Sequence, residues 1–260
     1  MPCSPRTEPL AAFTEEDRIL VTGASSGIGA AIALRCNSLG ATLIASGRSR
    51  EKLDAVKARA ARPELFHLEL RDLTDAPDTL SQWVQTLRER YGKFDGLVCA
   101  AGKTLTAPFM LYDPMQAREL FDLLCHIPLI LAKTVADRRN SRPACGIVFI
   151  AAVAAVAPNK GQSVYGAAKA ALVCAARCMA KELAPRGIRV NCISPGLVRT
   201  PMLEETIALL GEDFLREEEP LYPLGLGMPQ DVAGPAAFLL SSAARWITGQ
   251  NWIVDGGRTV

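Results

Sequence analysis

Tyr165 and Lys169 are the two side chains in this sequence whose types and spacing best suit proton transfer. They lie four positions apart, so on a helix they share one face. A free phenol has a pKa near ~10, which is too high for easy proton exchange at neutral pH. A lysine ammonium at ~4 Å favours the phenolate by up to ~4 kcal/mol at an effective dielectric of ~20. We therefore expect Lys169 to lower the pKa of Tyr165, the alternative being an ordinary helix face.

A glycine-rich turn near the start of the chain is the second feature with chemical meaning. It reads Thr22-Gly23-Ala24-Ser25-Ser26-Gly27-Ile28-Gly29 and lies between an apolar strand and a helix. Glycines let the backbone approach a pyrophosphate, and the following helix offers free N–H groups with a partial positive charge. A bare glycine pattern often matches by chance, but strand and helix flank this one on the correct sides. The turn predicts a site for the phosphates of a nucleotide cofactor.

The end of the second predicted strand bears on the choice between NAD and NADP. An acidic residue there would bind the ribose 2′-hydroxyl and repel a 2′-phosphate. Gly47 holds that position and Arg48 follows it. A guanidinium can hold a phosphate through two hydrogen bonds, and Arg50 could add to the positive field. A solvated surface arginine is the alternative for Arg48, but the missing acid favours NADP(H).

Short apolar runs alternate with longer helical stretches along most of the chain. The expected strands are Arg18–Thr22, Thr42–Ser46, Phe66–Glu69, Gly96–Cys99, Gly146–Ile150, Arg189–Ser194 and Asn251–Val254. The expected helices are Gly27–Leu39, Arg50–Ala60, Thr79–Tyr91, Pro114–Ala136, Ser163–Ala184 and Asp231–Leu239. Nearly continuous apolar strands suit burial on both faces of a parallel sheet. Strict alternation of strands and helices predicts a doubly wound α/β fold.

The chain of 260 residues suits one large α/β domain. Residues 1–14 are rich in proline and lack the apolar stretch of a signal peptide, so we expect a disordered tail. Residues 15–260 are then a single domain. Within this domain, residues 199–227 interrupt the alternation of strands and helices and contain several glutamates and prolines. We expect this segment to be a substrate lid.

Composition excludes several classes of partner. Hydrophobic residues make up 49%, charged residues 22%, and the net charge is +2, so we expect no nucleic-acid partner. The longest apolar run, residues 147–157, is shorter than the ~20 residues of a membrane span, so we expect no membrane partner and a cytoplasmic location. The 8 cysteines form no CxxC pair, which favours buried, reduced thiols and no metal site.

The turn Thr22-Gly-x-x-x-Gly27-x-Gly29 resembles the cofactor turn of the short-chain dehydrogenase/reductases. The resemblance extends over about residues 16–258. Its other motifs are Leu70-Arg71-Asp72-Leu73, Tyr165-Gly-Ala-Ala-Lys169, Asn191-Cys-Ile-Ser-Pro195-Gly196-Leu-Val198-Arg-Thr200, Ile247-Thr-Gly249-Gln and Val254-Asp255-Gly256-Gly257. The resemblance implies a Rossmann-like sheet of seven parallel strands with helices on both faces. It also implies a homo-oligomer, either a dimer or a tetramer.

The resemblance assigns roles to individual residues. Tyr165 becomes the acid/base for a carbonyl or carbinol, and Lys169 also holds the nicotinamide ribose. Asp72 contacts the adenine, while the Val198 backbone and the Thr200 hydroxyl hold the carboxamide. The implied cofactor-binding residues are Gly23, Ser25, Ser26, Gly27, Ile28, Gly29, Arg48, Asp72, Leu73, Cys99, Ala101, Gly102, Tyr165, Lys169, Pro195, Gly196, Val198 and Thr200.

Two residues of the family's catalytic set are absent. Ala152 stands where the family has a serine whose hydroxyl orients the substrate oxygen. Loss of one such donor typically lowers a rate by ~10²–10³. Leu124 stands where the family has an asparagine that supports a proton-relay water, and a leucine cannot hold that water. After the fourth strand, Cys99-Ala100-Ala101-Gly102 replaces the usual Asn-Asn-Ala-Gly.

Four neighbouring polar residues are candidates to substitute for these groups. His126 lies two positions beyond Leu124, and we expect it to face away from the site. Ser163 is expected to cap a helix. Lys103 and Thr104 follow the fourth strand, near the place where the family binds nicotinamide, and an ordinary loop role is the stronger interpretation for both.

Two hypotheses for function follow. The first is an NADP(H)-dependent oxidoreductase that interconverts a small-molecule carbonyl and an alcohol, favoured by the intact Tyr165 and Lys169 pair. The alternative is a non-catalytic NADP(H)-binding protein that acts as a sensor or supports an active partner, favoured by Ala152 and Leu124.

Overall fold

The computed structural model describes residues 12–260, in which seven parallel strands form one sheet in the order β3-β2-β1-β4-β5-β6-β7. The strands are β1 (Arg18–Thr22), β2 (Thr42–Gly47), β3 (Phe66–Leu70), β4 (Phe94–Cys99), β5 (Ser141–Ile150), β6 (Arg189–Pro195) and β7 (Asn251–Val254). The chain reverses its direction of winding between β3 and β4, so β1 and β4 are neighbours at the centre of the sheet. The predicted seven-stranded Rossmann-like sheet is confirmed.

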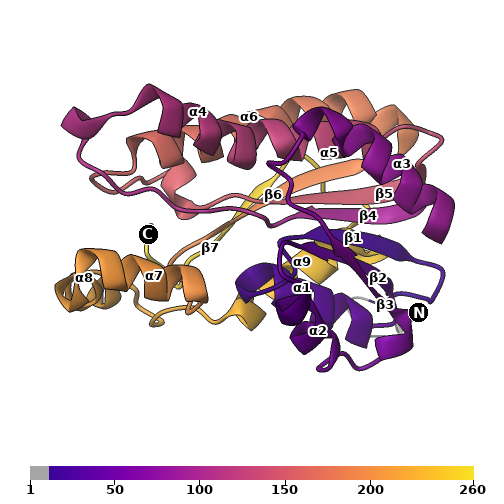
Figure 1. The fold of residues 1–260 in the computed structure, drawn as a ribbon, viewed down its shortest axis with the longest axis horizontal. Helices are drawn as coiled ribbons and strands as arrows, with labels where there is room; N and C mark the ends of the chain where they lie inside the picture. Colours follow the sequence, from indigo (N-terminus) through magenta and orange to yellow (C-terminus); the bar gives the residue numbers. More distant parts are fainter. Residues whose placement is uncertain (1–11) are drawn as a thin grey trace, which may run out of the picture.

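Nine α-helices of residues 12–260 surround the sheet. They are α1 (Gly27–Ser38), α2 (Arg50–Lys57), α3 (Leu80–Tyr91), α4 (Pro114–Phe121), α5 (Ile127–Val135), α6 (Ser163–Leu183), α7 (Pro201–Leu210), α8 (Glu212–Glu218) and α9 (Pro229–Leu240). Figure 1 shows α3, α4, α5 and α6 over one face of the sheet and α1, α2 and α9 on the other. Both faces of the sheet are therefore covered, which explains why its strands are nearly continuous in apolar residues.

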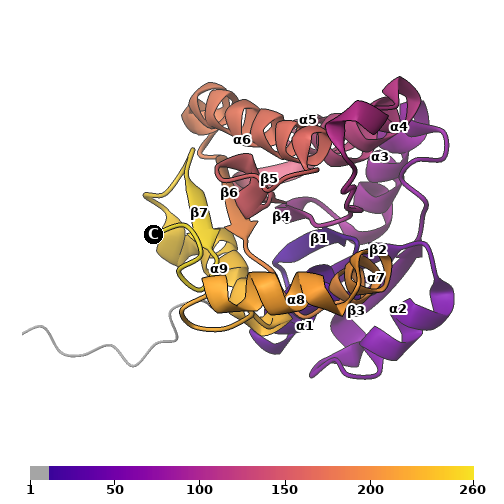
Figure 2. The ribbon, with the colours of Figure 1, turned by 90° about the vertical axis from the view of Figure 1, so that its left-hand side faces the viewer.

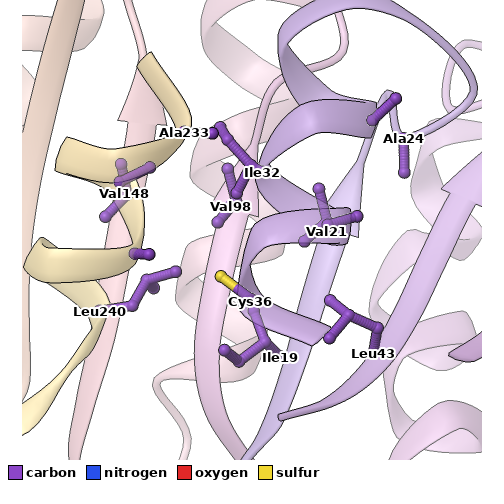
Figure 3. Packing of buried hydrophobic residues seen from close by; sticks show 14 of the residues in the cluster. Ile19, Val21, Ala24, Ile32, Cys36, Leu43, Val98, Val148, Ala233 and Leu240 are labelled. Atoms are coloured by element: carbon purple, nitrogen blue, oxygen red, sulfur yellow. The ribbon is translucent and has the colours of Figure 1, made fainter. Parts of the chain in front are cut away.

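The central strands are packed on both sides by fully buried aliphatic side chains. On the side of α1 and α9, Ile32 and Cys36 lie over Val21 and Val98, and Leu240 closes the layer (Figure 3). The opposite face is filled by a second layer that includes Leu20, Leu97, Phe149, Leu131 and Leu172. These two layers hold the sheet rigid, and loops at its carboxyl edge can therefore be placed precisely.

The helix that we expected over Pro114–Ala136 is interrupted. A π-helical turn at Asp122–His126 separates α4 from α5. Pro128 lies in the first turn of α5 and has no N–H to donate to the carbonyl of Leu124, so the regular hydrogen-bond ladder cannot continue through this point. Turns of this kind frequently lie at functional sites.

The predicted lid contains two helices that the sequence analysis did not anticipate. Thr200 caps α7 by accepting a hydrogen bond from the Leu203 N–H, and Pro201 occupies the first turn. Gly211, with a φ of 87°, separates α7 from α8. Figures 1 and 2 show α7 and α8 side by side at one end of the sheet.

Two smaller expectations need correction. Phe13 donates its backbone N–H to the Leu39 carbonyl and Thr14 bonds to Asp17, so these two residues lie against the domain rather than in a tail. Residues 1–11, and Cys3 with them, lie outside the described residues. Five cysteines are buried as expected, but Cys174 and Cys178 are exposed on the outer face of α6.

Between residues 12 and 260, no helix is long and apolar enough to span a bilayer. The same part of the chain contains no group of three or more histidine, cysteine and acidic side chains that could hold a metal ion.

The buried guanidinium of Arg189 caps the C-terminal end of α9. It donates hydrogen bonds to the carbonyls of Leu239, Leu240 and Ser241, with distances of 3.0 and 3.2 Å to the last two. These carbonyls have no partner within the helix because they belong to its last turn and to the residue that follows it. Burial lowers the pKa of Arg189, so the interaction offsets a desolvation cost.

We predict that Arg189→Met lowers the free energy of unfolding by about 2–4 kcal/mol, because three buried carbonyls lose their donor. Urea unfolding of the purified protein measures this change. The matched control is Arg59→Met, since Arg59 is exposed in the turn after α2. A loss equal to that of the control would contradict the capping role of Arg189.

Candidate active site

One cleft of about 720 Å³ runs along the carboxyl edge of the sheet and joins the glycine turn to Tyr165. The predicted cofactor residues that line it are Gly23, Ser25, Ser26, Gly27, Ile28, Gly29, Arg48, Asp72, Leu73, Ala101, Gly102, Tyr165, Lys169, Pro195, Gly196, Val198 and Thr200. Cys99 is not among the lining residues, because its side chain is buried in the core under β4. The structure thus brings together all but one of the residues selected from the sequence.

The glycine turn is in direct backbone contact with the end of β4. A Cβ at Gly23 would lie 2.6 Å from the Ala101 nitrogen, and φ of Gly23 is +69°. A Cβ at Gly29 would lie 2.2 Å from the Gly23 carbonyl oxygen. Both contacts are shorter than a methyl group allows, so glycine is required at each position.

The N-terminus of α1 opens into the cleft without a side-chain cap. Ser26 precedes the helix but accepts no hydrogen bond from its first turn, and that turn has no acidic residue. The N–H groups at this end lack helical partners and carry a partial positive charge. Because Ser26, Gly27 and Ile28 line the cleft, this end of α1 can hold an anionic group.

The end of β2 leaves no space for an acidic side chain. A Cβ at Gly47 would lie 2.9 Å from the Ser25 Cβ, so a larger residue would displace the glycine turn. The Arg48 side chain is 79% exposed, and its Nη1 lies 3.9 Å from Asp72 Oδ2. Arg50 does not line the cleft, because it pairs with Asp54 on α2 at 3.0 Å.

Asp72 closes the turn after β3 and faces the cleft. Its Oδ1 accepts hydrogen bonds from the Thr74 N–H at 2.9 Å and from the Thr74 hydroxyl at 2.7 Å. These bonds, with a smaller contribution from Arg48, hold the pKa of Asp72 below its ordinary value. Asp72 is therefore a carboxylate held by Thr74 beside the exposed guanidinium of Arg48.

Helix α6 places Tyr165 and Lys169 at the other end of the cleft. The helix begins at Ser163, but Ser163 caps nothing, because Gln162 occupies the preceding position. The expected cap is therefore wrong. Lys169 is buried and its Nζ donates to the Ile150 carbonyl oxygen at 2.7 Å. Its Nζ also lies 5.9 Å from the centroid of the Tyr165 ring.

Burial dominates the protonation of this pair. It raises the pKa of Tyr165 to about 12 and lowers the pKa of Lys169 to about 8. The expectation that Lys169 lowers the pKa of Tyr165 is not met, because the ammonium lies over the ring and donates to the Ile150 carbonyl. At neutral pH the phenol is protonated, as a proton donor must be.

Ala152 and Leu124 lie in the same cleft as Tyr165. Ala152 follows β5 and presents only a methyl group. Leu124 comes from the π-helical turn, and its Cδ2 would lie 3.1 Å from a Cβ at Gly102, so it fills the space beside that glycine. Neither side chain offers a hydrogen-bond donor or acceptor.

The four polar neighbours are divided between cleft and surface. His126 is exposed and faces away as expected, with its Nδ1 2.7 Å from Asp122 Oδ1. Lys103 and Thr104 both line the cleft, and Lys103 forms an ion pair with Glu119 at 3.7 Å. Ser163 does not line the cleft, so of the four only Lys103 and Thr104 face it.

Tyr222 packs against the segment after β6 and forms a hydrogen bond with its backbone. A Cβ at Gly196 would lie 2.7 Å from Tyr222 Cε1, and the Tyr222 hydroxyl accepts a hydrogen bond from the Leu197 N–H at 3.0 Å. Thr200 Oγ1 lies 3.2 Å from the Val198 carbonyl oxygen, to which it donates. The backbone of this segment therefore has a fixed course along the cleft wall.

A polar cluster that the sequence analysis missed forms the far wall of the cleft. Asn159 Nδ2 donates to Glu218 Oε1 at 3.0 Å, and Arg258 Nη2 donates to Asn159 Oδ1 at 3.3 Å. The three residues come from the loop before α6, the end of α8 and the C-terminal segment. Glu218 lies 59 positions and Arg258 lies 99 positions from Asn159 along the chain, so no local sequence pattern could have connected the three residues.

Known proteins resemble this chain over nearly its whole length. Residues 23–259 match the family model described as enoyl-(acyl carrier protein) reductase. The chain is 34% identical over 248 residues to 3-oxoacyl-(acyl-carrier-protein) reductase FabG from Thermotoga maritima, covering 93% of this chain and 97% of that one. It is 33% identical to human dehydrogenase/reductase SDR family member 4, covering 92% of this chain and 86% of that one.

The fold agrees with these similarities. A crystal structure of a short-chain dehydrogenase/reductase from Brucella melitensis has a TM-score of 0.85 at 32% identity, covering 95% of this chain and 98% of that one. The similarity in fold therefore agrees with the similarity in sequence. The chain belongs to the short-chain dehydrogenase/reductase family of oxidoreductases.

Proposed function

We propose that the protein is an NADP(H)-dependent oxidoreductase that interconverts a small-molecule carbonyl and an alcohol. The observation that carries the proposal is the single cleft that joins an uncapped helix N-terminus and Arg48 at one end to Tyr165 and Lys169 at the other. An extended dinucleotide needs both ends, because its phosphates and its nicotinamide are far apart. The carbonyl-reductase names of the bacterial relatives support the same reaction class.

The residues of the cleft fit the cofactor by their chemistry. The first turn of α1 would hold the pyrophosphate, and Arg48 would hold the 2′-phosphate through its guanidinium. The buried Ser46 hydroxyl beside Gly47 has no partner among the described residues and lines the cleft. Asp72 and Leu73 would border the adenine, Lys169 the nicotinamide ribose, and Pro195, Gly196, Val198 and Thr200 the carboxamide.

The reaction uses Tyr165 as the proton donor. NADPH, when bound, supplies the hydride for reduction of a carbonyl. Tyr165, protonated at neutral pH because of its burial, would give its proton to the carbonyl oxygen. Lys169, fixed by the Ile150 carbonyl, would hold the nicotinamide ribose beside Tyr165. Because Ala152 offers no second donor, the substrate oxygen depends on Tyr165 for its orientation.

Residues 199–227 would act as the lid over this site. Met202, Leu203 and Phe214 on α7 and α8 line the cleft and would exclude water from the reacting carbonyl. The relatives' reductase and dehydrogenase names give no support to the alternative of a non-catalytic NADP(H)-binding protein.

Assembly and location are also part of the proposal. We propose a homo-oligomer that packs through the outer face of α6, where Ala167, Ala170 and Cys174 form a row of small exposed side chains. Small residues let two helices approach closely. A cytoplasmic location stays a prediction, supported by the free thiols of the described cysteines.

We predict that Arg48→Ala weakens NADPH binding by about 10–100-fold and leaves NADH binding within about threefold, because only NADPH carries the 2′-phosphate. Fluorescence titration with each cofactor measures both affinities. Arg50→Ala is the control, because Arg50 is paired with Asp54 outside the cleft. Equal losses for the two cofactors would contradict the assignment.

We predict that Tyr165→Phe lowers kcat for carbonyl reduction by at least about 100-fold, while Ala152→Ser raises it by about tenfold or more. Steady-state oxidation of NADPH over a panel of ketones and aldehydes measures both changes. Tyr112→Phe is the matched control, since Tyr112 is exposed and does not line the cleft. An unchanged rate in Tyr165→Phe would exclude Tyr165 as the proton donor.

We predict that Ala170→Arg converts the oligomer to single chains, because a charged, bulky side chain then lies in the proposed helix contact. Sedimentation velocity measures the mass in solution. Ala55→Arg, at an exposed position of α2, should keep the oligomeric mass. A wild-type protein that sediments as one chain would overturn this part of the proposal.

A further inference from the structure

We propose that Lys160 is a specificity-determining residue that, together with Lys103, binds an oxyanion on the substrate, separate from the carbonyl that reacts. The inference rests on the proposed function, because it concerns the substrate of the same cleft. It assigns a substrate class: carbonyl compounds that also carry a carboxylate or a phosphate group.

The first support is that both lysine side chains can be reached from the cleft. Lys160 is an exposed residue of the loop before α6. Lys103 follows β4, and its side chain is 52% exposed. Both residues line the cleft together with Tyr165. A ligand that enters the cleft can therefore replace the water around either ammonium group.

The second support is that the protein leaves these two charges largely unpaired. Among the described residues, Lys160 has no ion-pair partner. The ammonium of Lys103 lies 3.7 Å from Glu119 Oε2, and both of these side chains are exposed. An exposed pair at this distance contributes little free energy and is screened by salt, so Lys103 stays available to a ligand.

The acidic residues of the cleft do not neutralise the two lysines. Glu218 accepts a hydrogen bond from Asn159 and lies 3.7 Å from the Arg258 guanidinium. Glu217 is exposed on α8 and forms no ion pair with either lysine among the described residues. Four cations stand against two carboxylates among the charged lining residues that follow Gly102 in the chain, which are Lys103, Lys160, Lys169, Glu217, Glu218 and Arg258.

The third support is that the loops that carry the two lysines are fixed to each other. The Ala107 N–H donates to the Gly161 carbonyl oxygen at 3.0 Å, which joins the loop after β4 to the loop before α6. The Gln162 N–H donates to the Asn159 carbonyl oxygen at 3.2 Å, which closes a tight turn. Gly161, with a φ of +80°, is the third residue of this turn, and Lys160 is the second. The packing of these loops therefore sets the backbone positions of both charges.

Hydroxyl groups on the same wall complete the chemistry of an oxyanion site. Thr104 and Thr106 are half-buried, and both line the cleft on the loop that carries Lys103. Neither hydroxyl forms a hydrogen bond with a described residue, so each can donate to a carboxylate or phosphate oxygen. Hydrogen bonds from charged donors to an oxyanion are stronger than those to a neutral group, so this wall favours an anionic substrate.

The test compares methyl ketones that carry a terminal carboxylate, two to five methylenes from the carbonyl, with the methyl esters of the same acids. NADPH is the reductant at a saturating concentration, and acid and ester differ chiefly in charge. For the length that fits, the wild-type protein should have a kcat/KM about three- to tenfold higher for the acid, through a lower KM. Added salt should lower this acid-to-ester ratio, because it screens exposed charges.

Lys160→Met should lower the acid-to-ester ratio, and Lys160→Glu should reverse the preference, because a carboxylate then repels the acid. The double variant Lys103→Met/Lys160→Met should use acid and ester equally. Each variant is measured with both substrates, so an effect common to acid and ester cancels in the ratio. Lys52→Met is the matched control, because Lys52 is exposed on α2, does not line the cleft and should keep the wild-type ratio.

Hydroxyketone phosphates, compared with the same hydroxyketones without phosphate, form a second arm of the test. A preference confined to one arm assigns the carboxylate or the phosphate as the group that is bound. Equal use of the charged and the neutral compound in both arms would overturn the inference. A preference that survives in Lys103→Met/Lys160→Met would overturn it as well. If Lys160 only paired with Glu217 of the lid, Lys160→Met would change acid and ester equally, which would also contradict it.

The outcome is separable from that of the proposed function. Reduction of the esters reports the proposed function alone. If neither acid nor ester is reduced, the proposed function fails, and calorimetric titration of the protein with each pair in the presence of NADPH decides the inference. Tighter binding of the acid that is lost in Lys103→Met/Lys160→Met supports it. Equal binding of acid and ester, or no binding of either, overturns it.

Discussion

The contact between the glycine turn and the end of β4 is the constraint on which the site depends. Gly23 lies so close to Ala101, and Gly29 so close to the Gly23 carbonyl, that no side chain fits at either position. This packing brings the N-terminus of α1 to the carboxyl edge of the sheet. The same edge carries the ends of β5 and β6, so the phosphate end and the Tyr165 end belong to one cleft.

The chemistry at the far end of the cleft is governed by burial rather than by the lysine charge. Tyr165 is held protonated, Lys169 is fixed by a backbone carbonyl, and Ala152 and Leu124 contribute no polar atoms. Under the proposed function, proton transfer then depends on Tyr165, and the orientation of the substrate depends on the shape of the cleft walls.

Much of this arrangement could be predicted from the sequence, because local patterns encode it. The glycine turn, the pair on α6 and the apolar strands each have a period or spacing that fixes their geometry. The break at residues 122–126 also has a local cause, Pro128, which removes one helical donor. Two features lacked such a signal. The pKa of Tyr165 depends on burial, and the cluster of Asn159, Glu218 and Arg258 joins segments far apart in the chain. The side chain of Cys99 lies in the core and not in the cleft, because a strand end alone does not show which way its side chain points.

Calorimetric titration of the wild-type protein with NADP⁺ and with NAD⁺ tests the central claim most directly. Gly47 leaves no room for an acid, and Arg48 lies at the cleft beside it. We expect NADP⁺ to bind at least about tenfold more tightly than NAD⁺, because a charge-assisted phosphate contact is worth about 1.5–3 kcal/mol. Equal affinities, or tighter binding of NAD⁺, would contradict the account.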